Sequence, residues 1–211
     1  MKNFVRLVML LAVVVGLLGC NVDDNGTNPG GGVGWNNTCG TDGTAGSCKT
    51  VVIGGQTWLA ENLNYQTGTS WCYKDSASLC KKYGRLYDWE TAKMACPSGW
   101  HLPTSDEWDA LVTAAGGNTA GKKLKSTSGW NKNNNGNGTN DFGFSALPGG
   151  GHYSEGGNFG FSYAGYLGNW WTATEIRSNI ANFRRMDYST DGVGDYSDGK
   201  SAGWSVRCVA D

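Results

Sequence analysis

Cysteines restrict the folds that are open to this chain. There are seven, and Cys20 stands apart from the other six, at the end of an apolar leader. An even number of cysteines in an exported domain indicates three disulfides, although the sequence alone permits many pairings. The six are Cys39, Cys48, Cys72, Cys80, Cys96 and Cys208.

Spacing narrows the choice of pairs. Cys39–Cys48 spans a Gly-rich turn and Cys72–Cys80 spans a short polar segment, so each pair can close a small loop. This leaves Cys96–Cys208, which would tie the first predicted helix to the last predicted strand and close a long loop. Metal binding by the cysteines is the alternative, but neither Cys-x-x-Cys nor a paired-histidine spacing supports it.

The N-terminus has the pattern of a bacterial lipoprotein signal. Lys2 and Arg6 give a basic start, and the apolar run Leu7–Leu18 is shorter than the roughly 20 residues of a membrane-spanning helix. A Leu-Leu-Gly sequence before Cys20 resembles the lipobox, at which cleavage leaves the cysteine as the lipid-modified first residue. We therefore expect residues 1–19 to be removed; an ordinary secretory signal beside an unrelated cysteine is the alternative.

A short tether follows the predicted anchor. Residues 20–34 are mostly Asn, Gly, Asp and Pro, a composition typical of a flexible linker. The acids of Asn21–Asp24 look like the export tag of surface lipoproteins. We expect the chain to be anchored in the outer membrane through its lipid only, with a single surface-exposed domain over residues 35–211.

Composition limits the partners of this domain. The net charge of −1 becomes −3 once Lys2 and Arg6 are cleaved away, so no basic field exists to hold nucleic acid. The chain has 34 glycines and 10 tryptophans but only 17% charged residues. This balance favours tight turns around large aromatic anchors over long solvated helices.

Local patterns predict helices in the first half of the domain. A Gly-Gly turn joins two strands, Val51–Ile53 and Gln56–Leu59, and residues 62–82 show no clear period. A helix is expected over Trp89–Cys96, ended by Pro97.

A second helix has a capping box at its start. In this pattern Thr104 and Glu107 satisfy each other's backbone amides. Trp108, Leu111, Val112 and Ala115 then form its apolar face, and a third, shorter helix is expected over residues 119–125.

The second half of the domain reads as short strands and long loops. An irregular Asn- and Gly-rich loop covers residues 131–141. Strands are expected over Gly143–Leu147, Gly168–Ala173, Ala181–Met186 and Trp204–Val209. Helices early and antiparallel strands later, with Gly- and Trp-rich loops and disulfides, predict an α+β fold with two main helices.

Five motifs, in order, are similar to those of one family. They are GQTWLAENL (55–63), YGRLY (83–87), CPSGWHLPT (96–104), FGFSALPGG (142–150) and SVRCV (205–209). Together they resemble the Fibrobacter succinogenes major paralogous domain, from about Val51 to Asp211. This family has no established biochemical activity, so the resemblance implies a domain type and no reaction.

A more remote resemblance concerns the fold. The Leu-Pro-Thr start of the capped helix and the Ser205–Arg207 strand look like the formylglycine-generating enzyme superfamily, which has a C-type lectin-like fold. That resemblance implies a disulfide between the first helix and the last strand, consistent with Cys96–Cys208. It does not carry function over.

Catalytic residues are not evident. Oxygen-dependent formylglycine generators carry a copper-binding cysteine pair late in the chain, whereas this sequence has only Cys208 there. His101 and His152 are the only histidines, and no nucleophile is identified for either. We expect a domain that is not an enzyme and has no cofactor.

Calcium is the one metal that the pattern leaves open. The Glu-Pro-Asn or Gln-Pro-Asp and Trp-Asn-Asp triplets of calcium-dependent lectins do not occur. Asp187, Asp191, Asp195 and Asp198 recur every three or four residues and could surround a cation, though solvated loop acids are the favoured interpretation.

Aromatic residues of the late loops are the candidate binding residues. Sugar rings stack on Trp and Tyr, while neighbouring polar groups bind the hydroxyls. We select Tyr153, Glu155, Trp170, Trp171 and Tyr188, and expect one of the two adjacent tryptophans to be exposed, because neighbours in a strand face opposite ways.

The sequence thus predicts a surface lipoprotein that binds a glycan or a protein partner. A structural component of the cell envelope, a degenerate formylglycine-generating-type enzyme and a hypervariable receptor are the alternatives.

Overall fold

The computed structural model describes residues 39–155 and 158–211, which form one compact unit. The predicted signal peptide (1–19), the anchor Cys20 and the tether (20–34) lie outside the described residues, and their assignment stays a prediction. Within the described part, no helix has the length and hydrophobicity to cross a membrane.

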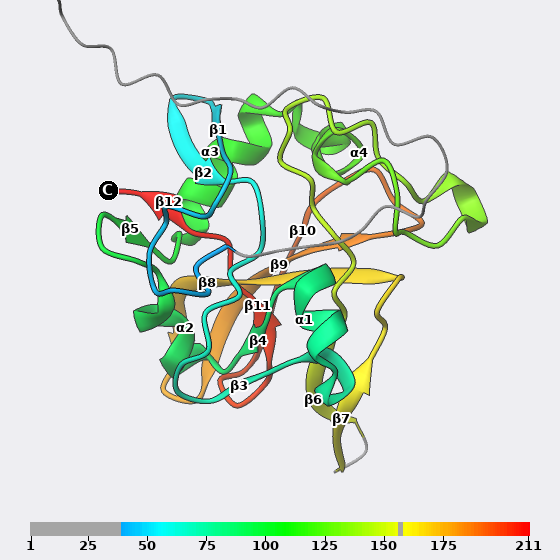
Figure 1. Cartoon of the computed structure of the whole chain (residues 1–211). Coiled ribbons are helices and arrows are strands. Elements are labelled where there is room, and N and C mark those ends of the chain that lie inside the picture. Colours follow the sequence, from blue (N-terminus) through cyan, green and yellow to red (C-terminus); the bar gives the residue numbers. More distant parts are fainter. Residues whose placement is uncertain (1–38, 156–157) are drawn as a thin grey trace, which may run out of the picture. The chain divides into compact units, whose positions relative to one another are not determined.

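The strands form two larger sheets and a separate hairpin. They are β1 (Thr50–Ile53), β2 (Gln56–Leu59), β3 (Ser70–Trp71), β4 (Leu86–Tyr87), β5 (Trp100–His101), β6 (Gly151–Glu155), β7 (Asn158–Ser162), β8 (Leu167–Arg177), β9 (Ile180–Asp187), β10 (Gly194–Gly199), β11 (Trp204–Ser205) and β12 (Val209–Ala210). One sheet has the order β1-β2-β12-β5 and the other β10-β9-β8-β11-β4-β3. The β6–β7 hairpin extends away from both (Figure 1).

The helices are short. They are α1 (Ala77–Tyr83), α2 (Trp89–Ala95), α3 (Ser105–Ala114) and α4 (Ala120–Leu124), with 3-10 turns η1 (Tyr73–Asp75), η2 (Gly117–Thr119) and η3 (Asn133–Asn135). The predicted capping box of α3 is confirmed: Thr104 N donates to Glu107 Oε2 at 2.7 Å, and Glu107 N donates to Thr104 Oγ1 at 3.2 Å. Mixed helices and antiparallel strands make this an α+β domain.

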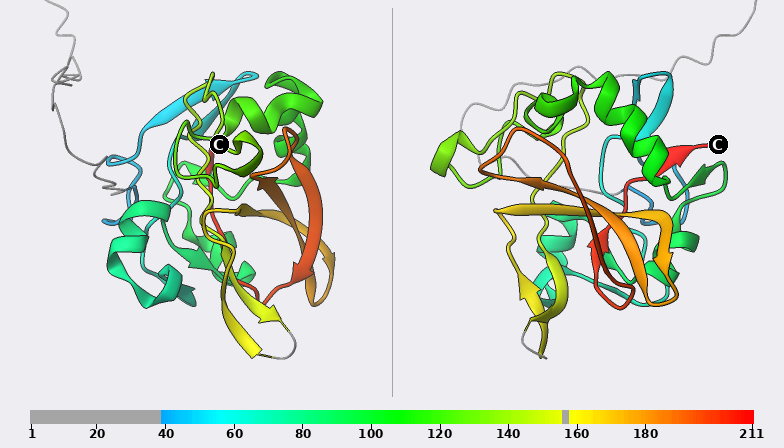
Figure 2. Two further views of the ribbon diagram at one scale, coloured as in Figure 1. Left: turned by 90° about the vertical axis from the view of Figure 1, so that its right-hand side faces the viewer. Right: turned by 180° about the vertical axis from the view of Figure 1, so that it is seen from behind.

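Strand β8 lies between two hydrophobic cores. Trp171 packs with Phe183 and Trp204 in the core that α2 covers, whereas Trp170 packs with Trp108 in the core that α3 covers. Alternate residues of the strand therefore enter opposite cores. Figure 2 shows the paired strands β8, β9 and β10 from two further sides.

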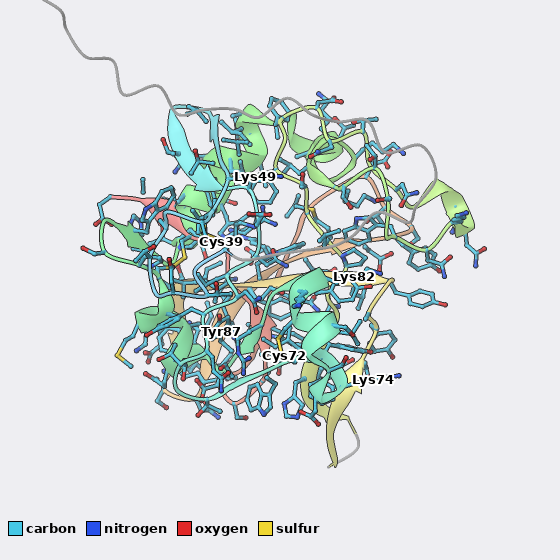
Figure 3. The ribbon with its side chains drawn as sticks, viewed as in Figure 1. Cys39, Lys49, Cys72, Lys74, Lys82 and Tyr87 are labelled. Atoms are coloured by element: carbon cyan, nitrogen blue, oxygen red, sulfur yellow. A yellow bond between two sulfur atoms is a disulfide. The ribbon has the colours of Figure 1, made fainter. Side chains whose placement is uncertain are left out.

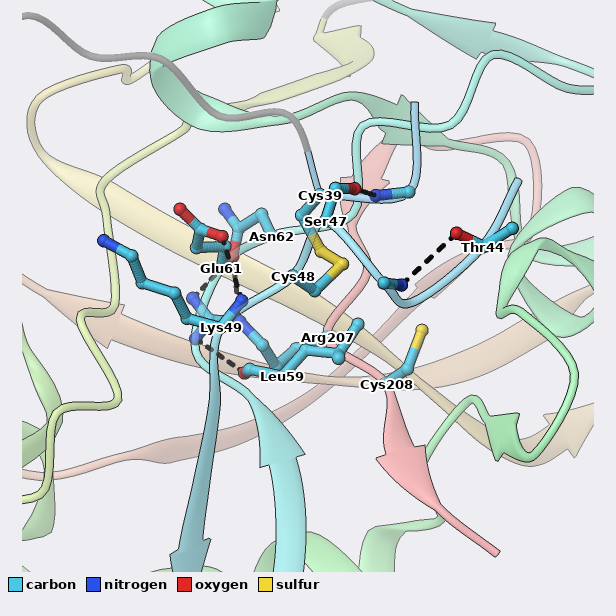
Figure 4. The surroundings of a disulfide bond; sticks show 12 residues. Cys39, Thr44, Ser47, Cys48, Lys49, Leu59, Glu61, Asn62, Arg207 and Cys208 are labelled. Carbon is cyan, nitrogen blue, oxygen red and sulfur yellow. Dashed lines mark hydrogen bonds between the residues drawn. A yellow bond between two sulfur atoms is a disulfide. The ribbon is translucent and has the colours of Figure 1, made fainter. Parts of the chain in front are cut away.

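A buried arginine near the end of the chain binds the end of β2 and the segment that follows it. Arg207 donates from Nη1 to Leu59 O at 3.1 Å and from Nη2 to Asn62 Oδ1 at 2.8 Å (Figure 4). The same Asn62 oxygen accepts from Trp170 Nε1 at 2.8 Å, and the guanidinium lies 4.3 Å from the ring centre of Phe144. Burial lowers the pKa of Arg207 to about 9, which leaves it charged at neutral pH and in need of these partners.

Three disulfides join the expected pairs, Cys39–Cys48, Cys72–Cys80 and Cys96–Cys208. The second pair connects the start of η1 to α1, a segment that Figure 3 marks with Cys72, Lys74 and Lys82. The third spans 112 residues and fixes the end of α2 to the segment before β12. The second disulfide therefore anchors a segment with few buried side chains, and the third joins two segments that are far apart in the sequence.

Most of the predicted local elements are confirmed. The Gly-Gly hairpin is β1–β2, the three predicted helices are α2, α3 and α4, and the expected strands Gly168–Ala173 and Ala181–Met186 lie within β8 and β9. Residues 131–141 contain only the 3-10 turn η3. Helix α1 and strands β3 to β7 and β10 were not predicted.

Two of the predicted strands are wrong. Gly143–Leu147 is not a strand: Gly143 has φ +71° and Ser145 φ +54°, Asn140 Oδ1 accepts from Ser145 N at 2.7 Å, and Ala146 alone makes an isolated bridge, to Lys125. Trp204–Val209 is not continuous either. It crosses from one sheet, as β11, to the other, as β12, and the buried side chain of Arg207 lies at the crossing.

Candidate functional site

Two exposed tyrosines stand on the turn between β7 and β8. Tyr163 is 45% exposed and Tyr166 is 43% exposed. The carbonyl of Tyr163 accepts from Tyr166 N at 3.0 Å and from Leu167 N at 3.0 Å, so the turn is closed by its own backbone. Tyr163 has φ +65°, a left-handed conformation that costs a bulky L-residue about 1–3 kcal/mol. A glycine would occupy this position at lower cost.

Two of the predicted binding residues support these tyrosines. Tyr153 on β6 stacks on Tyr163 with ring centres 6.4 Å apart and an angle of 15°. Tyr188, which follows β9, meets Tyr166 edge-on at 5.3 Å. Both supporting rings are half-buried. The side chain of Glu155 lies outside the described residues, so its role stays a prediction.

The rings continue across the sheet as a series of contacts. Tyr153 is followed by Trp204 at 5.2 Å, Trp204 by Phe183 at 5.1 Å, and Phe183 by Tyr196 at 5.7 Å. Tyr196 on β10 is 48% exposed, whereas Trp204 and Phe183 are buried. We call this series the aromatic strip: Tyr163, Tyr153, Trp204, Phe183 and Tyr196.

Arg185 completes the strip at the β10 end. Its guanidinium carbon lies 4.8 Å from the ring centre of Tyr196 and 5.2 Å from that of Phe183. Nε donates to Asn169 Oδ1 at 2.7 Å. The strip therefore presents exposed rings at both ends, with a half-buried cation at one of them.

The expectation for the adjacent tryptophans is wrong. Trp170 and Trp171 are both 0% exposed, because both faces of β8 are covered. Trp171 Nε1 donates to Tyr87 O at 2.8 Å, and Trp170 Nε1 donates to Asn62. Their rings form core, so neither can stack on a ligand in this structure.

Neighbouring side chains hold each of the two histidines in place. His101 lies between two carboxylates, with Nδ1 2.8 Å from Asp211 Oδ1 and Nε2 2.8 Å from Glu107 Oε1. Burial alone lowers the pKa of His101, but the hydrogen bonds and charges of Asp211 and Glu107 outweigh it and raise this pKa above its usual value. The imidazole therefore joins the capping box of α3 to the chain end.

His152 is held by aromatic rings. Its imidazole stacks on Trp71 with ring centres 4.4 Å apart, and Phe161 lies at 4.7 Å. Burial lowers the pKa of His152, and the charge of Asp75 offsets part of that effect. The ring is thus kept mostly neutral and packed.

The late acids are not gathered into a metal site. Asp187 accepts from Ser189 N at 2.7 Å, and Asp195 lies 3.7 Å from the guanidinium of Arg184 and accepts from Asn182. No group of three or more His, Cys, Asp or Glu side chains among the described residues could hold a metal ion. Solvated or locally bonded acids fit these positions better than calcium ligands.

Sequence reasoning did not select Tyr163, Tyr196 or Arg185. Alternation along β9 places Phe183 and Arg185 on one face and Arg184 on the other, and that signal was available in the sequence. The pairing of β9 with β10, which brings Tyr196 beside Arg185, is non-local and was not.

A family model described as the Fibrobacter succinogenes major domain matches residues 51–210. No curated protein and no solved structure matches the chain. The match runs from the second residue of β1 to the end of β12, so the aromatic strip lies entirely within it.

Proposed function

This chain belongs to the Fibrobacter succinogenes major domain family, and from that premise we propose that it is a non-enzymatic cell-surface lipoprotein whose domain binds a glycan through the exposed rings at the ends of the aromatic strip. The proposal also holds that the scaffold is C-type lectin-like. The helix-to-strand crossing of Cys96–Cys208 supports that fold.

The observation that carries the proposal is the presentation of Tyr163. Its ring is exposed, it lies nearly parallel to the Tyr153 ring with ring centres 6.4 Å apart, and its backbone is in a left-handed conformation that bulky residues rarely adopt. Backbone strain of this kind is enriched at functional sites, which supports a functional role for the Tyr163 side chain. A flat, rigid and amphipathic ring is what stacking on a sugar requires.

The non-enzymatic part of the proposal has separate support. His101 is held between two carboxylates, and His152 is stacked between aromatic rings. Each imidazole therefore has a packing role that does not require catalysis. The surface location is supported by the leader and by Cys20, which the sequence alone describes.

The test is a glycan array probed with the full chain in detergent. We expect wild-type protein to bind at least one plant or bacterial glycan, and Tyr163→Ala to weaken that binding about two- to tenfold, the range of one aromatic contact. Met94→Ala is the matched control, because Met94 is 79% exposed on α2 and outside the strip.

A blank array would contradict glycan binding and favour the structural alternative. Cross-linking in cells would then recover one constant neighbouring protein. Copper uptake with peptide oxidation by the purified chain would instead favour the degenerate-enzyme alternative.

A further inference from the structure

Arg185 is a half-buried cation with no acidic partner in the described part of the chain. None of the Asp or Glu oxygens described there lies within 4 Å of its guanidinium, whereas the neighbouring Arg184 pairs with Asp109 at 2.9 Å. Asp195, the acid beside them on β10, also lies by Arg184. The charge of Arg185 is contacted by one amide oxygen and two aromatic rings, but no described carboxylate neutralises it.

The guanidinium is held in a fixed orientation. Nε donates to Asn169 Oδ1, and Asn169 is itself 1% exposed and donates from Nδ2 to Gly150 O at 3.2 Å. Because Nε is occupied, the two terminal nitrogens remain, and they form the edge that binds a carboxylate end-on with two hydrogen bonds.

Tyr196 reaches this arginine because the residue opposite is glycine. Gly194 pairs with Arg185 across the β9–β10 ladder. A Cβ at Gly194 would lie 2.4 Å from Tyr196 Cε2 and 3.2 Å from its hydroxyl oxygen. The missing side chain therefore leaves room for the Tyr196 ring beside the cation, with the guanidinium carbon 4.8 Å from the ring centre.

We propose that Arg185 and Tyr196 form a subsite for the carboxylate of a uronic acid in an acidic glycan. The carboxylate accepts from the two terminal nitrogens, and the tyrosine hydroxyl and exposed rings contact the sugar. This inference rests on the proposed glycan binding and names the class of glycan. Since the mature chain carries a net charge of −3, the attraction is local and resides in Arg185.

The experiment titrates the full chain in detergent with polygalacturonate, glucuronoxylan and alginate. Each polymer is compared with its carboxyl-reduced form, which keeps the sugar stereochemistry but has no charge. We expect at least one acidic polymer to bind, and carboxyl reduction to weaken it about 10- to 100-fold, the range of a charge-assisted bidentate contact.

Two variants of the arginine locate the effect. Arg185→Gln should lower the affinity for the acidic polymer by a similar factor and abolish the difference in affinity between the acidic and the reduced form. Arg185→Lys keeps the positive charge but loses the two parallel N–H donors of the guanidinium, and should retain only part of the affinity for the acidic polymer. Arg177→Gln, which removes an exposed arginine at the end of β8, is the control and should change nothing.

A third variant tests the subsite without touching the charge. Gly194→Ala displaces the Tyr196 ring and should lower the affinity for the acidic polymer. A cooperative thermal unfolding curve checks that the variant is folded. Equal affinity for acidic and reduced forms, or binding to neutral array glycans alone, would overturn the uronate subsite and leave glycan binding intact. A chain that binds no glycan on either test would overturn both.

Discussion

Replacing Asn62 by alanine should be among the most damaging single changes in this domain. The side-chain oxygen accepts from Trp170 Nε1 at 2.8 Å and from Arg207 Nε and Nη2 at 3.2 and 2.8 Å. The side-chain nitrogen donates to Tyr83 O at 2.8 Å. All of these groups are buried, so water cannot replace the lost partner.

The magnitude follows from what the substitution leaves behind. A buried group without its partner costs about 1–3 kcal/mol, and more if it is charged. Asn62→Ala leaves an indole N–H and one side of a guanidinium without an acceptor, so we expect a loss of about 3–5 kcal/mol in the free energy of unfolding. That is a large share of the 5–15 kcal/mol typical of a domain.

Equilibrium unfolding in urea, with the disulfides intact, measures this loss. Asn62→Asp is the informative second variant, because a carboxylate keeps the acceptor for both donors and loses the hydrogen bonds that the amide nitrogen donates to Tyr83 O and Ser205 Oγ. We expect it to retain more than half of the stability that alanine loses. Asn179→Ala, at an exposed turn, should stay within about 0.5 kcal/mol of wild type. A loss below about 1 kcal/mol for Asn62→Ala would refute the reasoning.

Further predictions concern His101 between its two carboxylates, the Cys96–Cys208 disulfide, the core and the aromatic strip. The carboxylate partners of His101 raise its pKa in the folded protein, so its contribution to the free energy of unfolding is complete below pH 6.5 and is lost as the pH rises through the higher pKa of the folded state. Thermal unfolding of the wild type at a series of pH values should show this loss. The His101→Gln variant should not show it. Replacing both Cys96 and Cys208 by serine should cost about 5 kcal/mol in chemical unfolding, given the 112-residue separation. Trp171→Ala should cost about 3–5 kcal/mol without a selective loss of ligand at temperatures where the variant is folded, and a selective loss would restore this ring as a binding residue. Tyr163→Gly should leave the unfolding midpoint nearly unchanged, because relief of strain offsets lost packing, yet weaken glycan binding in calorimetry.

Short-range signals in the sequence predicted much of the fold. The capping box at Thr104 and the Gly-Gly hairpin turn act over a few residues, so one sequence suffices to locate them. Helix α1 was not predicted, because only its Cys80 and Tyr83 are buried and its sequence therefore has no apolar stripe. Its place depends on the Cys72–Cys80 disulfide and on the packing of two side chains rather than on an amphipathic pattern.

The candidate binding surface was harder to predict than the fold. Alternation correctly places Trp170 and Trp171 on opposite faces of β8, but it cannot show that both faces are covered. Exposure of Tyr163 and Tyr196 depends on the turn after β7 and on the pairing of β10, which are tertiary facts. Of the residues selected from the sequence, Tyr153 and Tyr188 therefore support the exposed rings instead of forming them.

Tyrosine ring resonances, followed by NMR in ¹³C-labelled protein during addition of a glycan that the array identifies, give the most direct test of the strip. The account predicts that the signals of Tyr163 and Tyr196 shift together with the binding curve, while that of the fully buried Tyr87 stays in place. Saturable binding that leaves both exposed rings unmoved would contradict it.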